Sequence, residues 1–226
     1  MLPLRVERFE LTYEVAITPS LAAIIDMPGN IVSPLLSQLD GMGVDLSDIS
    51  LDDGPLEDRG LNCDVDEHNA NILLRANRFE IRFFTADENE DAEAGILGGV
   101  WMALASVSPE IAAKSHSLLF EFDCEIAAGS YGEALDRFCQ PYEGLPGGTE
   151  TAVVYYLPAD SVRGFLDSSV VLNRSAEVNG GLLLAATLVF EGKRFTQDDV
   201  IPAGRRRLNE LLRSLDITLK DFRGYS

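Results

Sequence analysis

The sequence predicts an α+β fold in which a mainly antiparallel sheet carries helices packed on one face. Alternating apolar and polar residues indicate strands in both halves of the chain, most clearly at 4–17 and 117–128. Apolar residues at helical spacing follow both of these strands, and short polar turns separate the remaining strands. A chain of 226 residues can bury its own core, so we expect a single domain over 1–226.

The expected strands are apolar or alternating segments bounded by proline, glycine or polar turns. They lie at 4–17, 61–65, 71–75, 78–85, 117–128, 151–157, 165–178 and 181–190. Pro19 ends the first strand, and Asn179-Gly180 indicates a hairpin between the last two. Residues 44–60 are acidic and poor in periodicity, so we expect an exposed loop there.

The expected helices have an apolar stripe at a spacing of about 3.6 residues. Two lie within 20–42, one runs from 87 to 107, one spans 131–139 and one begins after Thr196. Asp87 and Glu90 have the spacing of a capping box before the third helix. Gly95, Gly98 and Gly99 would weaken that helix, so we expect them to permit close packing.

An internal similarity relates the two halves of the chain. Residues 9–17 align without gaps with residues 120–128, and the order strand, helix, three strands, helix follows from each copy. A tandem duplication of a β-α-β-β-β-α unit, with pseudo-repeats 4–110 and 115–226, would account for this order, although such patterns also arise by chance. The layout is similar to the saddle of TATA-binding-type folds, and this likeness of element order implies no function.

The chain is strongly acidic, with 37 Asp and Glu against 18 Lys and Arg and a net charge of −19. This charge repels phosphate backbones and anionic lipid surfaces, so we expect no nucleic-acid partner. The longest apolar stretches, 96–107 and 181–190, are shorter than a membrane span, and the first residues lack an export pattern. Three cysteines, an odd number, fit reduced thiols. We expect a cytoplasmic protein without a membrane partner.

No common catalytic or phosphate-binding motif occurs in the sequence. This lack of motifs favours a protein that is not an enzyme. Asp64, Asp66 and His68 would share one strand face and could ligate a metal, but a solvated turn between strands is the favoured interpretation. His116 and Cys139 could form a thiol nucleophile pair, which the sequence alone leaves open. We expect no metal and no cofactor, and the catalytic residues of any activity stay unknown.

Two further segments have a functional and a structural interpretation. The 140–149 loop could hold an anion on its backbone amides, or it could be a plain connector. Four glutamates at corresponding points of the two halves could hold a cation or exchange protons. The simpler interpretation of these residues is the polar face of an antiparallel sheet; they are Glu10, Glu14, Glu121 and Glu125.

Composition and the lack of motifs favour a non-catalytic protein-interaction or regulatory module whose acidic surface binds a basic partner protein. The alternative is a small-molecule-binding protein or an enzyme with a pocket between helices and sheet. The region 95–99 or the loop 140–149 could form the mouth of such a pocket. A third interpretation, a nucleic-acid mimic, is weakened by the apolar alternation of the acidic strands.

The last part of the chain is basic, with eight basic against five acidic residues over 193–223. Three successive arginines spread around a helix at about 100° per residue, so at least one must lie near the apolar stripe. Carboxylates of the same chain or of a second copy are their expected neighbours. We therefore assign Arg205, Arg206, Arg207 and Arg213 to an interaction site and expect a homodimer.

Overall fold

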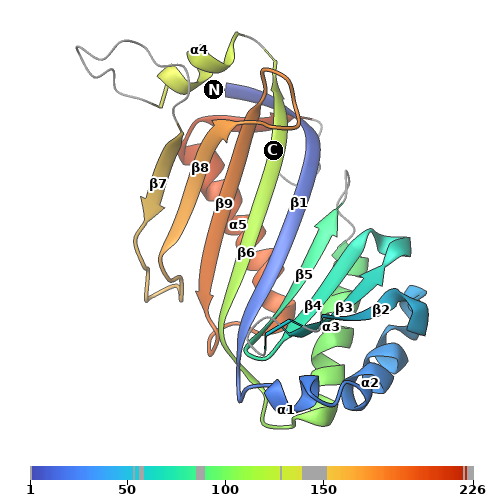
Figure 1. The fold of residues 1–226 in the computed structure, drawn as a ribbon. Helices are drawn as coiled ribbons and strands as arrows, with labels where there is room; N and C mark the ends of the chain where they lie inside the picture. Colours follow the sequence, from blue (N-terminus) through green and yellow to red (C-terminus); the bar gives the residue numbers. More distant parts are fainter. Residues whose placement is uncertain are drawn as a thin grey trace.

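The structure is a computed structural model, and it describes residues 2–52, 54–55, 59–84, 90–127, 129–138, 152–220 and 222. One large sheet dominates the fold, and its combination with helices confirms the α+β class (Figure 1). The strand order is β2-β3-β4-β5-β1-β6-β9-β8-β7, with antiparallel neighbours throughout. An additional strand, β10, pairs in parallel with the start of β1.

The elements have the following bounds. The strands are β1 Leu2–Thr18, β2 Ile49–Asp52, β3 Gly60–Val65, β4 Ala70–Arg75, β5 Arg78–Phe84, β6 Ala112–Ile126, β7 Val153–Leu157, β8 Ser168–Arg174, β9 Leu182–Glu191 and β10 Ile217–Lys220. The α-helices are α1 Ala22–Ile25, α2 Gly29–Leu39, α3 Glu90–Val107, α4 Tyr131–Asp136 and α5 Gln197–Ser214. Single 3-10 turns cover Asp40–Met42, Leu46–Asp48 and Asp66–His68.

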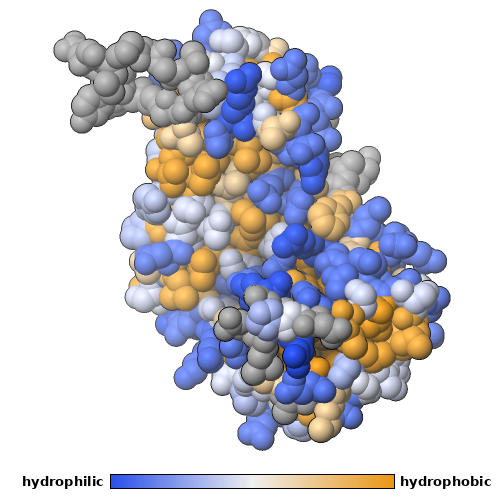
Figure 2. Space-filling model, viewed as in Figure 1, coloured by the Kyte–Doolittle hydropathy of each residue, from blue (hydrophilic) through white to orange (hydrophobic). Residues whose placement is uncertain are grey.

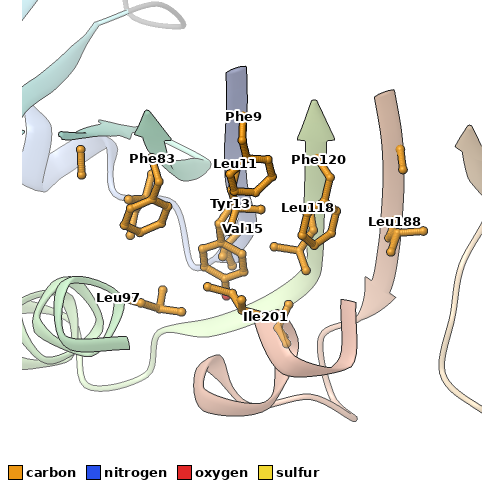
Figure 3. Close-up of a cluster of buried hydrophobic side chains, with 14 of the residues drawn as sticks. Phe9, Leu11, Tyr13, Val15, Phe83, Leu97, Leu118, Phe120, Leu188 and Ile201 are labelled. Carbon is orange, nitrogen blue, oxygen red and sulfur yellow. The ribbon is translucent and has the colours of Figure 1, made fainter. Parts of the chain in front are cut away.

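The core lies on one face of the central strands. Strand β1 has 17 residues, and its alternation is regular from Phe9 to Ile17, with the side chains of Leu11, Tyr13 and Val15 fully buried on this face. Figure 3 shows Leu97 of α3 and Ile201 of α5 on the same side as these buried chains. Figure 1 views β6 to β9 from the opposite face, with α5 behind them and no described helix in front. The central and C-terminal strands therefore have an open face.

The expected loop at 44–60 is wrong for Ile49–Asp52, which forms edge strand β2 against β3. Four residues between aspartates carry too short an alternation to be told from a loop. The sequence prediction also misses β10, whose buried Ile217 and Leu219 lie beside the start of β1. In both cases a long-range strand partner, rather than local pattern, decides the conformation.

The strand expected at 165–178 is limited to Ser168–Arg174. The Ser175 hydroxyl accepts hydrogen bonds from the backbone amides of Glu177 and Val178, and this local turn ends the pairing early. The connection to β9 covers residues 175–181 and is longer than a two-residue hairpin, and Gly180 adopts a positive φ of 71° in it.

The two halves of the chain share one feature of strand order. In the first half β1 lies beside β5, which precedes the long helix α3, and in the second half β6 lies beside β9, which precedes the long helix α5. The tandem duplication of 4–110 and 115–226 stays a prediction. The described residues do not include Asp87, Cys139 or the 140–149 loop. The capping box, the thiol pair and the anion-binding loop expected there therefore stay predictions. In the part of the chain that is described, no helix is long and apolar enough to cross a membrane.

Candidate functional site

Two glutamates face each other at the centre of the open sheet face. The pairing of β1 with β6 places Glu10 directly opposite Glu121. Hollows of about 360 and 340 Å³ lie on either side of this pair, and both glutamates line both hollows. The glutamate pair is therefore flanked by two hollows on the open face.

Arginines neutralise most of the surrounding carboxylates. Arg8 contacts Glu10 at 3.4 Å, and Arg78 contacts Glu14 at 3.0 Å. Arg82 forms a close ion pair with Glu80, which lies on β5. These pairs are partly exposed and contribute little stability individually, but they fix where negative charge remains.

Glu121 is the carboxylate that these arginines leave unpaired. It is half-buried, and among the described residues it has neither a hydrogen-bond partner nor an ion-pair partner. Burial raises the pKa of Glu121, and the carboxylates of Glu10 and Asp123 raise it further against the opposing effect of Arg8 and Arg82. An unpaired carboxylate in this environment gains from a cationic partner.

An uncharged apolar field adjoins the glutamate pair on the same face. It is formed by β7, β8 and β9, whose open-face side chains include Val154, Tyr156, Val171, Leu183, Ala185 and Val189. Tyr156 is 82% exposed and Val154 is 42% exposed. Figure 2 shows hydrophobic surface over β7 to β9 next to hydrophilic surface toward β1. The open face thus combines a negative centre with an apolar flank.

A separate hollow of about 460 Å³ lies between α3, the start of β6 and the segment 192–197. Trp101 and Met102 form its wall on α3, and Phe195 and Lys193 line the opposite side. Lys193 is exposed and has no ion-pair partner among the described residues. None of the residues 95–99 lines this hollow, and the expected small-molecule pocket between helices and sheet stays a prediction.

The buried residue at this hollow is His116, which is 1% exposed. Its Nδ1 atom lies 2.7 Å from the hydroxyl of Tyr13. Burial raises the pKa of Tyr13, so the phenol stays protonated. When this phenol donates to Nδ1, the imidazole proton lies on Nε2, on the side of the backbone at Phe195 and Gly192. Burial lowers the pKa of His116, although the backbone at Phe195 and Gly192 partly opposes this effect.

Two buried donors beside the hollow lack a regular hydrogen bond. They are Nε2 of His116 and Nε1 of Trp101, and neither has a partner of regular geometry within the described residues. The closest groups are the backbone at Phe195 and Gly192 for His116, and the hydroxyl of Tyr13 for Trp101. Leaving a buried donor unsatisfied costs about 1–3 kcal/mol. A small molecule with acceptor atoms that reached these donors would recover part of this free energy.

The four arginines named from the sequence have different environments. Arg205 is buried and donates to Glu93 of α3 at 2.7 Å. Arg207 donates to Glu210 at 2.9 Å and lies over the ring of Phe165. The other two, Arg206 and Arg213, are exposed on α5. Arg213 also has an interaction within the chain, and the contact of these arginines with a second copy stays a prediction.

The residues weighed as metal ligands are not brought together on one strand face. Asp64 is on β3 and accepts a hydrogen bond of 2.7 Å from Asn71, whereas Asp66 and His68 lie in the 3-10 turn that follows. Among the described residues, no cluster of three or more metal-ligating side chains occurs. The segment has the position of a turn between strands, which is the interpretation that the sequence favoured.

The described cysteines are not suited to nucleophilic chemistry. Cys63 and Cys124 are free and buried. Burial, with a smaller effect of nearby carboxylates, raises the pKa of each thiol to about 12. Both therefore stay protonated at neutral pH and act as small apolar side chains of the core.

The sequence predicts that four glutamates lie on the face opposite the apolar one: Glu10, Glu14, Glu121 and Glu125. The strand register shows that Glu10 and Glu121 lie opposite each other. Glu125 pairs with Arg5 at 3.0 Å and is set apart from the central hollows. The apolar field was not expected, since only the strand order brings β7 to β9 beside the glutamates.

No family model matches the chain, and no curated protein matches it either.

Proposed function

We propose that the protein is a non-catalytic protein-interaction module that binds a partner through the open face of its sheet. The observation that carries this proposal is the unpaired carboxylate of Glu121 opposite Glu10, beside an uncharged apolar field. The partner is a protein segment that presents a lysine or arginine next to apolar side chains. Its cation would enter a hollow beside Glu121, and its apolar groups would cover β8 and β9.

A protein segment fits this face better than a bare metal ion does. A guanidinium can donate to two carboxylates at once, and Glu10 and Glu121 stand on adjacent strands at one register position. A metal ion would leave the adjoining apolar field uncovered, including the side chain of Tyr156. The mixed character of the surface therefore favours a polypeptide.

The test is selection from a random peptide library on the wild-type protein and on two variants, Glu121→Gln and Glu10→Gln. We expect the wild-type protein to enrich peptides with Arg or Lys beside apolar residues, and each variant to weaken binding of a selected peptide about tenfold or more. Glu125→Gln is the matched control on the same strand, and it should leave binding unchanged. Selection without a preference for basic residues, or equal binding by all variants, would refute the proposal.

The hollow at His116 supports a second candidate function, the binding of a small molecule with acceptor atoms. The observation in its favour is the pair of buried donors on His116 and Trp101. Trp101 is the only tryptophan of the chain, so its fluorescence reports directly on occupancy. Titration with a library of small carboxylic acids and amides should change this fluorescence saturably in the wild-type protein. Tight binding that also survives Met102→Lys at the wall would place the ligand elsewhere.

A further inference from the structure

The open-face side chains form rows across the sheet, because neighbouring strands pair residue by residue. One row begins with Val171 of β8, which lies beside Ala185 of β9. It continues with Glu121 of β6 beside Ala185, and with Glu10 of β1 beside Glu121. Neighbouring strands lie about 4.8 Å apart, so the row passes from apolar to acidic within about 15 Å. The unpaired carboxylate of Glu121 therefore adjoins the small side chain of Ala185 directly.

Strand β9 lies at the boundary between the apolar field and the glutamate pair. Its alternate residues are buried in the core, and the residues between them are half-buried on the open face. The hollow of about 360 Å³ reaches β9 at one end of this line, and the hollow of about 340 Å³ reaches it on the other side of Ala185. The open-face positions of β9 in this line are Leu183, Ala185, Thr187 and Val189.

The strands below this surface have their backbone hydrogen bonds within the sheet. Each of β6, β9 and β8 has a strand neighbour on both sides. A single extended segment laid over them would therefore bury its own amides and carbonyls without partners, which is unfavourable. An α-helix makes these hydrogen bonds within itself, so it can cover an apolar sheet face without this loss. The surface is thus suited to a helix rather than to an added strand.

The spacing of side chains on β9 also matches a helix. Residues on one face of a strand are about 6.6–6.8 Å apart, and helix residues four positions apart rise by about 6 Å. A helix along β9 therefore stays in step with the line from Leu183 to Val189, which is about 20 Å long and corresponds to about 13 helical residues. On the opposite face of these strands the same kind of layer is already provided by α5 (Figure 1).

We propose that the partner segment of the open face is an amphipathic α-helix of about 13 residues that lies along β9 and places an arginine or lysine beside Glu121. Its apolar side chains contact Leu183, Val189 and Val171, and its basic residue lies on the flank that faces β6. Ala185, the neighbour of Glu121, is an inner position of the line, so the basic residue belongs to an inner turn of the helix. The net charge of −19 favours the approach of such a helix.

This inference rests on the proposed function and adds the conformation and register of the partner. Two peptide libraries with the same randomised residues test it on the wild-type protein. One library carries these residues on one face of a helical scaffold rich in alanine and glutamine, and the other carries them in an extended scaffold with regularly spaced prolines. We expect the helical library to enrich an Arg or Lys in an inner turn, with Leu, Ile or Val three or four positions away. The extended library should yield no binder of comparable affinity.

Substitutions on the open face test where an enriched helix lies. Ala185→Lys places a cation beside Glu121 and a long side chain under the helix, so it should weaken binding at least tenfold. Ser50→Lys is the matched control, because Ser50 is exposed on the same face at edge strand β2 and the charge change is the same. It should leave binding unchanged. Thr187→Lys, which lies further along β9, is the second variant should Ala185→Lys fail to fold.

A double-mutant cycle tests the contact with Glu121. One arm replaces the basic residue of the enriched peptide by Gln, and the other arm is Glu121→Gln in the protein. Each change alone should weaken binding about tenfold or more. Because both remove the same contact, the second change should add less than about threefold to the first.

The possible failures of the two proposals are distinguishable. Basic and apolar residues enriched only in the extended library would overturn the helix and leave the proposed function standing. No preference for basic residues in either library would overturn both. Equal losses in Ala185→Lys and Ser50→Lys, or additive effects in the cycle, would overturn the placement of the helix along β9.

Discussion

Arg205 of α5 donates a hydrogen bond to Glu93 of α3 at 2.7 Å in the interior of the molecule, with only 11% and 4% of the two side chains exposed. The two residues are 112 positions apart in the chain and fasten the two long helices to each other. Breaking a buried ion pair by removing one partner leaves an uncompensated charge in a medium of low dielectric constant. This pair is therefore a point where a single substitution has a large effect on stability.

We expect Arg205→Met to lower the free energy of unfolding by about 3–5 kcal/mol, because Glu93 would stay buried without its cation. Urea denaturation followed by circular dichroism measures this change. Replacing both members, as Arg205→Met with Glu93→Leu, should recover most of the loss. Arg206→Gln is the neighbouring control and should change stability by less than about 0.5 kcal/mol, because Arg206 is exposed. Equal effects at both arginines would contradict this assignment.

The glycines of α3 differ in what a side chain would meet. A Cβ at Gly99 would lie 2.7 Å from Cδ2 of Leu39 and 3.2 Å from the carbonyl oxygen of Gln38, both on α2, whereas a Cβ at Gly98 meets nothing within 4 Å. Gly98→Ala should therefore stabilise the protein by about 0.5–1 kcal/mol through helix propensity alone. Gly99→Ala should destabilise it by about 1–3 kcal/mol through overpacking. Thermal unfolding of the two variants measures both, and the same sign for both would refute the packing role of Gly99.

The sequence predicts most elements correctly where local pattern and final environment agree. The alternation in β1 specifies a half-buried strand, and Leu11, Tyr13 and Val15 are indeed buried on one face. The pattern is too weak at β2 and β10, whose conformation depends on strands distant in sequence. The glycine expectation is correct for Gly99 and not for Gly98, since sequence does not tell which side of a helix meets a neighbour.

The candidate site was less accessible to sequence reasoning than the fold. Alternation places Glu10 and Glu121 on polar strand faces, but their direct opposition depends on the register between β1 and β6. Carboxylate neighbours for the arginines were expected, yet the identity of Glu93 as the partner of Arg205 depends on how α3 and α5 pack. Register and helix packing are tertiary properties, and one sequence does not specify them locally.

We expect Glu121→Gln to raise the free energy of unfolding at pH 7. The pKa of Glu121 in the folded state is raised above its ordinary value of 4.5, by burial first and then by Glu10 and Asp123. As pH rises through this range, the unfolded chain loses its proton before the folded chain does, so the ionised carboxylate destabilises the fold at neutral pH. The gain from the amide should therefore shrink when unfolding is measured at about pH 4.

Glu125→Gln is the matched control for this measurement. Glu125 lies on the same strand, is 53% exposed and pairs with Arg5. Its substitution should alter stability by less than about 0.5 kcal/mol at either pH. A stability loss in Glu121→Gln at neutral pH would mean that the carboxylate is satisfied within the chain, and the partner-binding proposal would lose its main support.

A hydrogen bond of 2.7 Å joins the Tyr13 hydroxyl to Nδ1 of the buried His116. We expect nitrogen-15 NMR to show a neutral ring with its proton on Nε2 and a titration midpoint below the ordinary 6.5, because burial lowers the pKa of His116. As pH falls through 6.5 the unfolded chain takes up the proton first, so this residue makes the fold less stable in acid. Tyr13→Phe should cost about 1–3 kcal/mol, since it leaves Nδ1 buried without a donor. A ring already protonated at pH 6.5, or an unchanged unfolding free energy in Tyr13→Phe, would contradict this arrangement.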